Sequence, residues 1–307
     1  MMTGRSGSPD EQQRWAMGER AHLLNVGYRL LGSLVEAEDA VQEAYARWLA
    51  LSPQQRAGIA NPGAWLTTVT SRICLDLLRS ARTRREAYVG DWIPEPLPGP
   101  ANVGNLRPGE VNIDPADRIT LDESVGMALM VVMESLTPAE RVAFILHDVF
   151  GYPFAEVADI VGRSPGACRQ LASSARARIR QSRGSTASPR RQAAVIGQFK
   201  RAWQAKDIGA LVGLLDPSVV ATADGGGRAI TFRDPIEGRD QVIQAWLELA
   251  DRVGDMAFVE RTVNGQPGLV ASQGGVVVTI FAFEVVDDRI RHIWAVRNPE
   301  KLRAWAS

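Results

Sequence analysis

Eleven basic residues and no acidic residue occur between Ile160 and Lys206. Arginine and lysine neutralise phosphates, and arginine can also bind the edge of a guanine base through two hydrogen bonds. The whole chain of 307 residues has 35 basic and 35 acidic residues, so the remainder has 24 basic against 35 acidic. Because charge is sorted by segment in this way, the window predicts a surface that binds DNA.

The first half of this window has the spacing of a helix-turn-helix. A short helix from Pro153 would end at Gly162, which can take the left-handed conformation of a tight turn, and Ser164 with Pro165 would begin the next helix. The inward positions would hold Val157, Val161, Cys168 and Leu171. The second helix could enter a major groove, although a basic bundle that binds protein is an alternative. The predicted DNA-binding residues are Arg163, Ser164, Arg169, Gln170, Ser173, Arg176 and Arg178.

A second arginine cluster lies at the end of a helix predicted over residues 64–85. Trp65, Val69, Ile73 and Leu77 recur every four residues and would pack inward, which leaves a basic outward face. Cations at a helix C-terminus also suit the helix dipole, so capping competes with phosphate binding. The candidate DNA-binding residues are Arg72, Asp76, Arg79, Arg82, Arg84 and Arg85.

The elements that position these residues fall into three blocks. Residues 12–88 and 118–184 follow a helical period of 3.6, whereas residues 191–307 begin as a helix and continue as strands. From Asp91 to Asp117 the chain has six prolines, three glycines, five acidic residues and one arginine. We therefore expect residues 89–117 to be an acidic, extended linker without a core, and residues 185–190 to be a short flexible joint.

Composition excludes several classes of protein. The chain is 45% hydrophobic and 23% charged, which is typical of a globular protein. The first residues lack the apolar run of a signal peptide, and the most apolar stretch, residues 275–286, has the length of a strand, so we expect a cytoplasmic protein with no membrane partner. Cys74 and Cys168 stand alone, without metal spacing. We expect no disulfide, metal or cofactor.

Together the two helical blocks resemble a bacterial extracytoplasmic-function (ECF) sigma factor of the sigma-70 family, which has two helical domains called sigma-2 and sigma-4. The matching residues are 28–33, 37–44, 64–79 and 153–183, with one departure at Arg72, where many members have Asn. The resemblance implies promoter-specific transcription initiation, with promoter DNA and core RNA polymerase (its beta-prime clamp helices and beta flap) as partners. The first helical block would read the minus 10 element and the helix-turn-helix the minus 35 element.

An acidic face in the first block acquires a role from this resemblance. Glu36, Asp39 and Glu43 share one side of a predicted helix capped by Ser33, and such a face is usually only solvated. The resemblance implies that Glu36, Asp39, Gln42 and Glu43 instead bind the polymerase.

The third block is similar to SnoaL-like domains, which are α+β cones whose helices close a curved sheet around a cavity. The fold class expected is therefore two all-α domains followed by an α+β cone. A subgroup of ECF sigma factors with this domain carries three motifs that occur here at residues 92–96, 224–228 and 298–301, with Arg228 and Glu300 as charge-preserving departures. They imply intramolecular contacts that modulate activity, made by Trp92, Pro94, Glu95, Asp224, Gly225, Gly226, Gly227, Arg228, Asn298, Pro299, Glu300 and Lys301.

Other functions of the third block stay open at this point. Asp224, Asp234 and His292 could serve acid-base chemistry, but no spacing singles out a pair, so we expect no catalytic residue and no enzyme. A small ligand could occupy the cavity, and the triple glycine should form a tight turn before a strand at residues 229–232. The alternative function is a one-component helix-turn-helix regulator with a ligand-sensing tail, which would not need a polymerase-binding helix.

Overall fold

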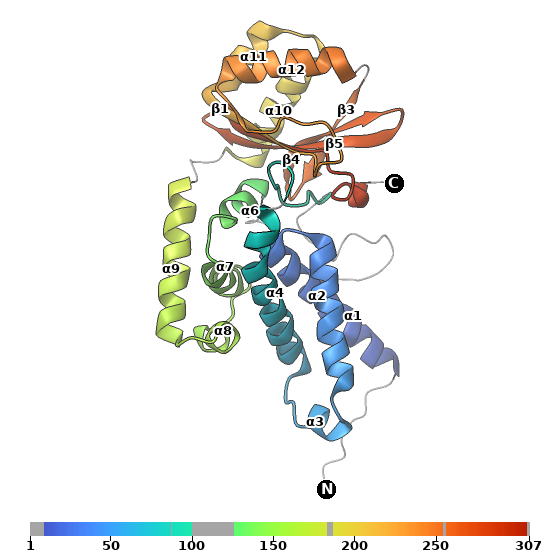
Figure 1. Cartoon of the computed structure of the whole chain (residues 1–307), viewed down its shortest axis with the longest axis vertical. Coiled ribbons are helices and arrows are strands. Elements are labelled where there is room, and N and C mark those ends of the chain that lie inside the picture. The colour runs from blue at the N-terminus through green and yellow to red at the C-terminus, as the bar shows by residue number, and fades with distance from the viewer. Residues whose placement is uncertain (1–8, 87, 100–125, 183–186, 254–255, 306–307) are drawn as a thin grey trace. The chain divides into compact units, whose positions relative to one another are not determined.

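The computed structural model describes residues 9–86, 88–99, 126–182, 187–253 and 256–305 (Figure 1). The side chains of residues 9–18, 81–86 and 250–253 lie outside this description. The described residues form two compact units. The first contains residues up to Arg79 together with 138–173, and the second contains the described parts of 80–101, 122–137 and 174–307.

Helices build the first unit. They are α1 (Pro9–Leu31), α2 (Leu34–Ala50), α3 (Pro53–Ala57), α4 (Pro62–Glu86, to Arg79), α7 (Pro138–Phe144), the π-helical turn η2 (Ile145–Val149), α8 (Phe154–Val161) and the start of α9 (Pro165–Ser182). The Ser33 hydroxyl caps α2 by accepting from the Glu36 backbone N–H at 3.4 Å. At Gly27 a Cβ would lie 3.0 Å from that of Ala37, so the glycine allows α1 and α2 to cross closely. This first unit is the all-α part that the sequence predicted.

A six-stranded sheet of order β2-β1-β6-β5-β4-β3 forms the centre of the second unit. Its strands are β1 (Leu215–Asp224), β2 (Ile236–Glu237), β3 (Ala257–Val263), β4 (Gln266–Gln273), β5 (Val276–Val286) and β6 (Arg289–Val296). β1 and β6 pair in parallel, while the other neighbours are antiparallel. Asp287 and Asp288 turn the final hairpin with φ of 49° and 63°.

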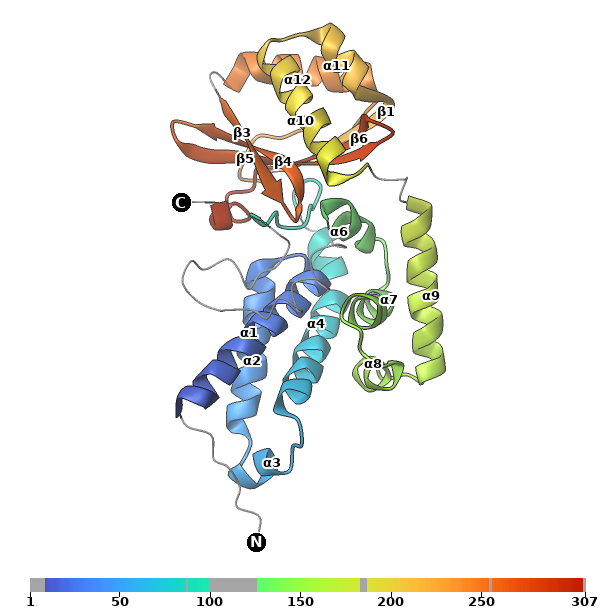
Figure 2. The same ribbon diagram turned by 180° about the vertical axis from the view of Figure 1, so that it is seen from behind.

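The two faces of the sheet are covered by different elements. The helices α10 (Pro189–Gln204), α11 (Ile208–Leu214) and α12 (Arg239–Val253) lie on one face (Figures 1 and 2). The opposite face packs against Ile93, Met127 of α6 (Met127–Met133) and Trp305 of the 3-10 turn η3 (Arg303–Trp305). Helices over a curved sheet confirm the predicted α+β fold of the third block.

Aromatic side chains occupy the space between the helices and the sheet. The Phe199 ring packs edge-on against Trp203, Trp246 and Phe283, with centroids 5.1–5.8 Å apart. In the part of the chain that the structure describes, the gap lined by Phe199, Trp203, Phe258 and Phe281 has no room for a water molecule. The inside of the cone is therefore largely a packed aromatic core.

Residues 93–97 of the predicted linker are irregular and buried, and Ile93 lies against the sheet face. One expectation about an irregular segment was wrong. Residues 229–232 are irregular and not a strand, and β2 begins only at Ile236. The glycine turn therefore leads into a long loop.

Candidate nucleic-acid interface and linker site

The helix-turn-helix has the geometry that the spacing predicted. Gly162 ends α8 in the left-handed region at φ 73°, and Ser164 Oγ accepts from the Ala167 N–H at 3.2 Å at the start of α9. The inward residues Val157, Val161 and Cys168 are buried, while Leu171 is half-buried. Of the predicted DNA-binding residues, Arg176 is half-buried, and the exposed ones are Arg163, Ser164, Arg169, Gln170, Ser173 and Arg178.

Two arginines of α9 already have protein contacts. The Arg169 guanidinium carbon lies 5.6 Å from the centre of the Phe154 ring, and Arg178 Nη1 donates to the Ser135 carbonyl oxygen at 3.3 Å. A cation over an aromatic ring keeps its outer N–H groups accessible. Arg169 is thus held at the start of α9, where a groove-binding helix carries its base contacts.

The outward face of α4 lies against α8 at one point. Arg72 Nη2 donates to the backbone carbonyl oxygen of Asp159 at 2.8 Å, although Arg72 is exposed. Asp76 and Arg79 form an exposed ion pair at 3.0 Å on the same face. The side chains of Arg82, Arg84 and Arg85 lie outside the described residues.

A second contact in the first unit joins the same two regions. The Tyr152 hydroxyl, just before α8, lies 2.8 Å from His22 Nε2 and donates to Thr67 Oγ1 of α4 at 3.4 Å. Beside it, the fully buried Arg29 lies 5.5 Å from the centre of the Phe150 ring. Side chains of α1 and α4 therefore hold the segment that leads into the helix-turn-helix.

The acidic face of α2 is open along most of its length. Asp39, Gln42 and Glu43 are exposed, whereas Glu36 is half-buried. Glu43 forms an exposed ion pair with Arg47 at 2.9 Å. Surface pairs of this kind contribute little to stability, so Glu43 can exchange this partner for another cation.

The predicted regulatory motifs meet around one buried carboxylate in the second unit. Asp224, at the end of β1, is fully buried, and its Oδ2 forms an ion pair with Lys301 Nζ at 2.6 Å. Its Oδ1 accepts from the Tyr88 hydroxyl at 2.7 Å, and Oδ2 accepts from the Ile93 backbone N–H at 3.0 Å. We call the group formed by Tyr88, Ile93, Asp224, Asn298 and Lys301 the linker latch.

Lys301 and Asn298 complete the linker latch from the C-terminal side. Lys301 Nζ also donates to the Ile93 carbonyl oxygen at 2.5 Å and lies 4.2 Å from the centre of the Trp92 ring. Asn298 Nδ2 donates to the Tyr88 hydroxyl oxygen at 2.9 Å. Burial, and then the hydrogen bond to Asp224, raise the pKa of Tyr88 well above its ordinary value of 10.0. The hydroxyl is thus held in its neutral, hydrogen-donating form.

The loop of residues 225–228, which we call the glycine loop, contacts the linker latch. Gly226 has φ 59° and donates its N–H to Asp224 Oδ1 at 3.0 Å, while a Cβ on it would collide with Asn298. Arg228 forms an exposed ion pair with Glu300 at 2.9 Å, so the two departures from the usual motif residues pair with each other. Pro94 and Glu95 are buried, Gly225 is buried, and Gly227 and Pro299 are exposed.

Further along, the linker follows the edge of the sheet. Leu97 exchanges two hydrogen bonds with Asn264, at 2.7 and 2.9 Å, and Pro98 bridges to Val263 of β3. Trp305 Nε1 donates to the Pro96 carbonyl oxygen at 2.7 Å. The linker therefore contacts the C-terminal domain along its length from Tyr88 to Gly99.

The three acid-base candidates do not converge. Asp224 is committed to Lys301, whereas His292 contacts Glu284 through Nδ1 at 3.1 Å and stacks on Trp294. Asp224 pairs in register with Val296, four residues beyond His292 along β6. Asp234 is exposed in the loop before β2.

Two segments match known families in the same order along the chain. Residues 18–84 match Sigma-70 region 2, and residues 126–179 match Sigma-70, region 4. ECF RNA polymerase sigma factor SigJ of Mycobacterium tuberculosis is 40% identical over 300 residues, which cover 92% of this chain and 90% of SigJ. The chain belongs to the ECF RNA polymerase sigma factors. It is also 33% identical over 291 residues to the probable ECF sigma factor SigI of the same species, over 92% of each chain.

A solved structure supports this family over nearly the whole length of the sigma factor. The crystal structure of M. tuberculosis SigJ has a TM-score of 0.73 and 36% identity, and covers 94% of this chain and 98% of SigJ. The match includes the third block, which a one-component regulator would not share with a sigma factor. The predicted family, fold and sigma-factor function are confirmed, and the one-component alternative is not favoured.

Several residues of these sites were not predicted from the sequence. Tyr88 precedes the first linker motif, and His22 and Tyr152 lie far apart in the chain. Among the described residues, no helix is long and apolar enough to cross a membrane. Nor does any group of three or more His, Cys, Asp and Glu in the described ranges have the arrangement of a metal site. Cys74 and Cys168 are buried, and burial raises the pKa of Cys74 to about 12, as suits core positions.

Proposed function

We propose that this sigma factor binds core RNA polymerase through the acidic face of α2 and promoter DNA through α4 and α9. Glu36, Asp39, Gln42 and Glu43 would bind the beta-prime clamp helices, and the sigma-4 region the beta flap. This proposal is supported by the accessibility of the four side chains, because three of them are exposed and the fourth is half-buried. Acidic side chains along one helix face are complementary to a basic partner helix.

The two DNA elements would be read by different means. Arg163, Ser164, Arg169, Gln170 and Ser173 at the exposed start of α9 would contact bases and phosphates of the minus 35 element as duplex, with Arg176 and Arg178 on phosphates. The α4 face with Arg72, Asp76 and Arg79, continued by Arg82, Arg84 and Arg85, would bind the minus 10 element. Arg72 can do so only after releasing the Asp159 carbonyl oxygen.

This requirement implies a closed and an open state of the first unit. In the closed state described here, Arg72 and Tyr152 hold α4 beside α8. The proposed open state breaks these few polar contacts, each of which contributes about 1 kcal/mol. Polymerase binding would supply the free energy that separates the sigma-2 segment, residues 12–88, from the sigma-4 segment, residues 118–184.

The C-terminal domain, residues 191–307, would modulate activity by holding the linker. The observation that carries this proposal is the linker latch, in which Lys301 binds both Asp224 and the backbone of Ile93. A linker held from Tyr88 to Gly99 has a shorter free length between the two DNA-reading segments. Because effective concentration depends on linker length, the latch would set the spacing at which both promoter elements can be bound together.

No reaction is assigned to the C-terminal domain in this proposal. Its only fully buried candidate, Asp224, is neutralised by Lys301 and bound by three hydrogen-bond donors besides. The aromatic packing around Phe199 does not favour a ligand inside the cone. We place the protein in the cytoplasm, where core polymerase and promoter DNA are found.

Transcription in vitro with purified core polymerase tests the proposal. On a promoter mapped from transcript start sites, the chain should direct initiation, and Lys301→Met should change output by releasing the linker. Arg191→Met, which removes an exposed ion pair with Asp288 outside the predicted regulatory contacts, is the matched control. Absence of promoter-dependent transcripts would refute sigma activity on that core enzyme. Equal output from Lys301→Met and wild type, with normal initiation, would refute only the role of the latch.

A further inference from the structure

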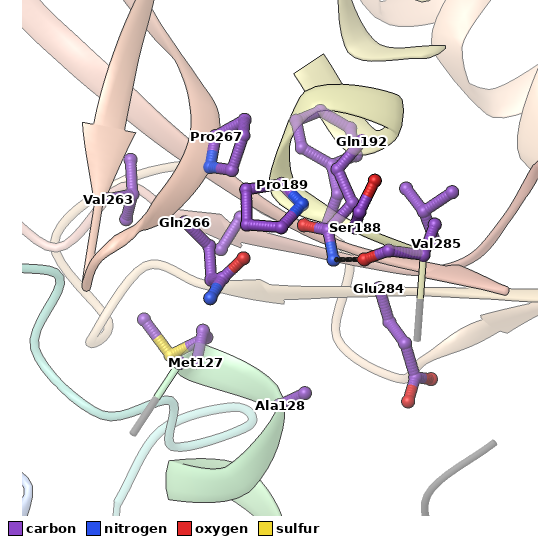
Figure 3. A pocket seen from close by; sticks show the side chains of 14 residues that line it. Met127, Ala128, Ser188, Pro189, Gln192, Val263, Gln266, Pro267, Glu284 and Val285 are labelled. Atoms are coloured by element: carbon purple, nitrogen blue, oxygen red, sulfur yellow. Dashed lines mark hydrogen bonds between the residues drawn. The ribbon is translucent and has the colours of Figure 1, made fainter. Parts of the chain in front are cut away.

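We infer that the second unit carries a binding site for a small organic cation beside its sheet, separate from the linker latch. A pocket of about 350 Å³ lies there between α6, the start of α10 and strands β4 and β5 (Figure 3). Its volume is in the range of small-molecule sites. The lining includes none of the five latch residues. It includes Phe283 and Val285 of the helix-side core as well as Ala282 and Glu284, but it shares no residue with the aromatic gap inside the cone.

The polar group that defines the ligand is the Glu284 carboxylate. Glu284 is only 7% exposed, and in Figure 3 its side chain extends from β5 toward the α6 side of the pocket. Among the described residues its partner of opposite sign is His292, 3.1 Å away, which is charged only when protonated. A carboxylate buried to this degree favours a charged hydrogen-bond donor as a partner.

A second polar side chain in the pocket also offers an acceptor. Gln266 Oε1 is buried and has no hydrogen-bond partner among the described residues. The Gln192 amide nitrogen, in contrast, already donates to the Ala187 carbonyl oxygen at 2.9 Å. Because buried polar atoms in native proteins are nearly always bonded, the unbonded Gln266 Oε1 favours a hydrogen-bond donor beside it.

The remaining walls of the pocket are apolar and suit a flat apolar group of the ligand. Met127, Val263 and Pro267 contribute apolar side chains to the lining. An apolar wall with a few polar groups is the pattern of a small-molecule site, and the acceptors of Glu284 and Gln266 select a cation with N–H groups, such as an amidinium, guanidinium or primary ammonium. Such a ligand would contact both α6, within the Sigma-70 region 4 segment, and the C-terminal sheet. Its binding would fasten α6 to the domain.

The test uses 4-fluorobenzamidine as the probe and 4-fluorobenzoate as its anionic counterpart of equal shape. Fluorine NMR with the full chain should show saturable broadening of the amidine signal with a dissociation constant of about 1 mM or lower. The benzoate should bind at least about tenfold more weakly, as expected when a charge-assisted hydrogen bond is lost. Equal binding of the two probes, or no saturable binding of the amidine, overturns the proposal.

Variants locate the site. Glu284→Gln keeps the size of the side chain and should weaken amidine binding about tenfold, whereas Glu237→Gln, on the exposed strand β2, should not. Ala128→Phe narrows the pocket while Glu284 stays in place, and should also weaken binding; it serves if Glu284→Gln unfolds. Unchanged binding in a folded Glu284→Gln or Ala128→Phe chain overturns the assignment. These outcomes do not depend on polymerase or promoter.

Discussion

Lys301 Nζ lies 2.6 Å from Asp224 Oδ2, and the same ammonium group donates to the Ile93 carbonyl oxygen at 2.5 Å. Asp224 is fully buried and Lys301 is 8% exposed. A single ammonium group therefore neutralises the Asp224 carboxylate at the end of β1 and also binds the backbone of the linker. A buried charge is costly when it loses its partner. Loss of the Lys301 ammonium group should therefore destabilise the C-terminal domain and release the linker at the same time.

Replacing Lys301 tests this coupling. Lys301→Met leaves Asp224 buried without its cation and should lower the free energy of unfolding of the C-terminal domain by about 3 kcal/mol. Denaturant unfolding followed by tryptophan fluorescence measures the change. The control Arg228→Met should cost at most about 1 kcal/mol, since the Arg228–Glu300 pair is exposed. Equal losses in the two variants would contradict a buried latch.

The pH dependence of the latch follows from Tyr88. Its pKa is raised in the folded chain, so the unfolded chain loses this proton first as the pH rises. The stabilisation is complete below the ordinary pKa of 10.0 and is lost as the pH climbs from there toward the folded pKa. Unfolding at about pH 9 and about pH 11 should show a larger loss for wild type than for Tyr88→Phe. The same loss in the wild-type chain and in the Tyr88→Phe variant would rule out Tyr88 as the titrating group.

Two glycines with nearly equal φ angles allow the free-energy cost of backbone strain to be separated from the cost of a steric collision. Gly226 has φ 59° beside Asn298, and Gly274 has φ 58° with nothing within 4 Å of an added Cβ. Gly274→Ala should cost about 1 kcal/mol, the backbone term alone. Gly226→Ala should cost more, because Asn298 must also move, and should expose the linker to protease. If both substitutions cost the same, the glycine loop is not packed against Asn298.

The contact before α8 predicts how the closed state opens. Tyr152→Phe removes the hydroxyl that contacts His22 and Thr67, and should favour the open state by about 1 kcal/mol, or about fivefold. Spin labels placed on α2 and α9 should show more of the longer distances by pulsed EPR. Thr67→Val, which removes only the longer of the two contacts, should shift the distances less. An unchanged distance distribution for Tyr152→Phe would argue against this contact as a restraint.

The proposed polymerase-binding face of α2 can be tested by charge reversal. Asp39→Lys should weaken binding to core polymerase about tenfold and increasingly so at low salt, because it opposes a basic partner. Asp240→Lys makes the same charge change at a side chain that is 91% exposed on the C-terminal domain, and should leave affinity unchanged. Fluorescence anisotropy of the labelled chain measures both. Comparable losses would mean that net charge matters and the α2 face does not.

The helix-turn-helix could be predicted from sequence because its signals are local. Gly162, Ser164 and Pro165 determine the turn within four residues, and Val157 and Cys168 mark the buried side at helical spacing. The type of each residue and its nearest neighbours were sufficient there.

The path of the linker could not be predicted by such means. Residues 93–97 are too rich in proline to indicate a strand or helix, and their burial depends on partners such as Asn264, 167 residues from Leu97. Tyr88 and Arg72 are likewise positioned by long-range contacts, with Asp224 and Asp159. The residue type of Arg72 indicated a possible role, Tyr88 was not predicted, and both partners were set by the tertiary fold.

The separation of Ile93 and Lys301 by 208 residues also orders events during synthesis. At about 5–20 residues per second, the ribosome needs about 10–40 seconds to add the lysine after the linker has been made. Strand β6, which lies between β1 and β5 in the sheet, is likewise made last. The nascent chain thus exposes both of the segments proposed to bind DNA before the linker latch can form, so each new molecule passes once through an interval without the latch.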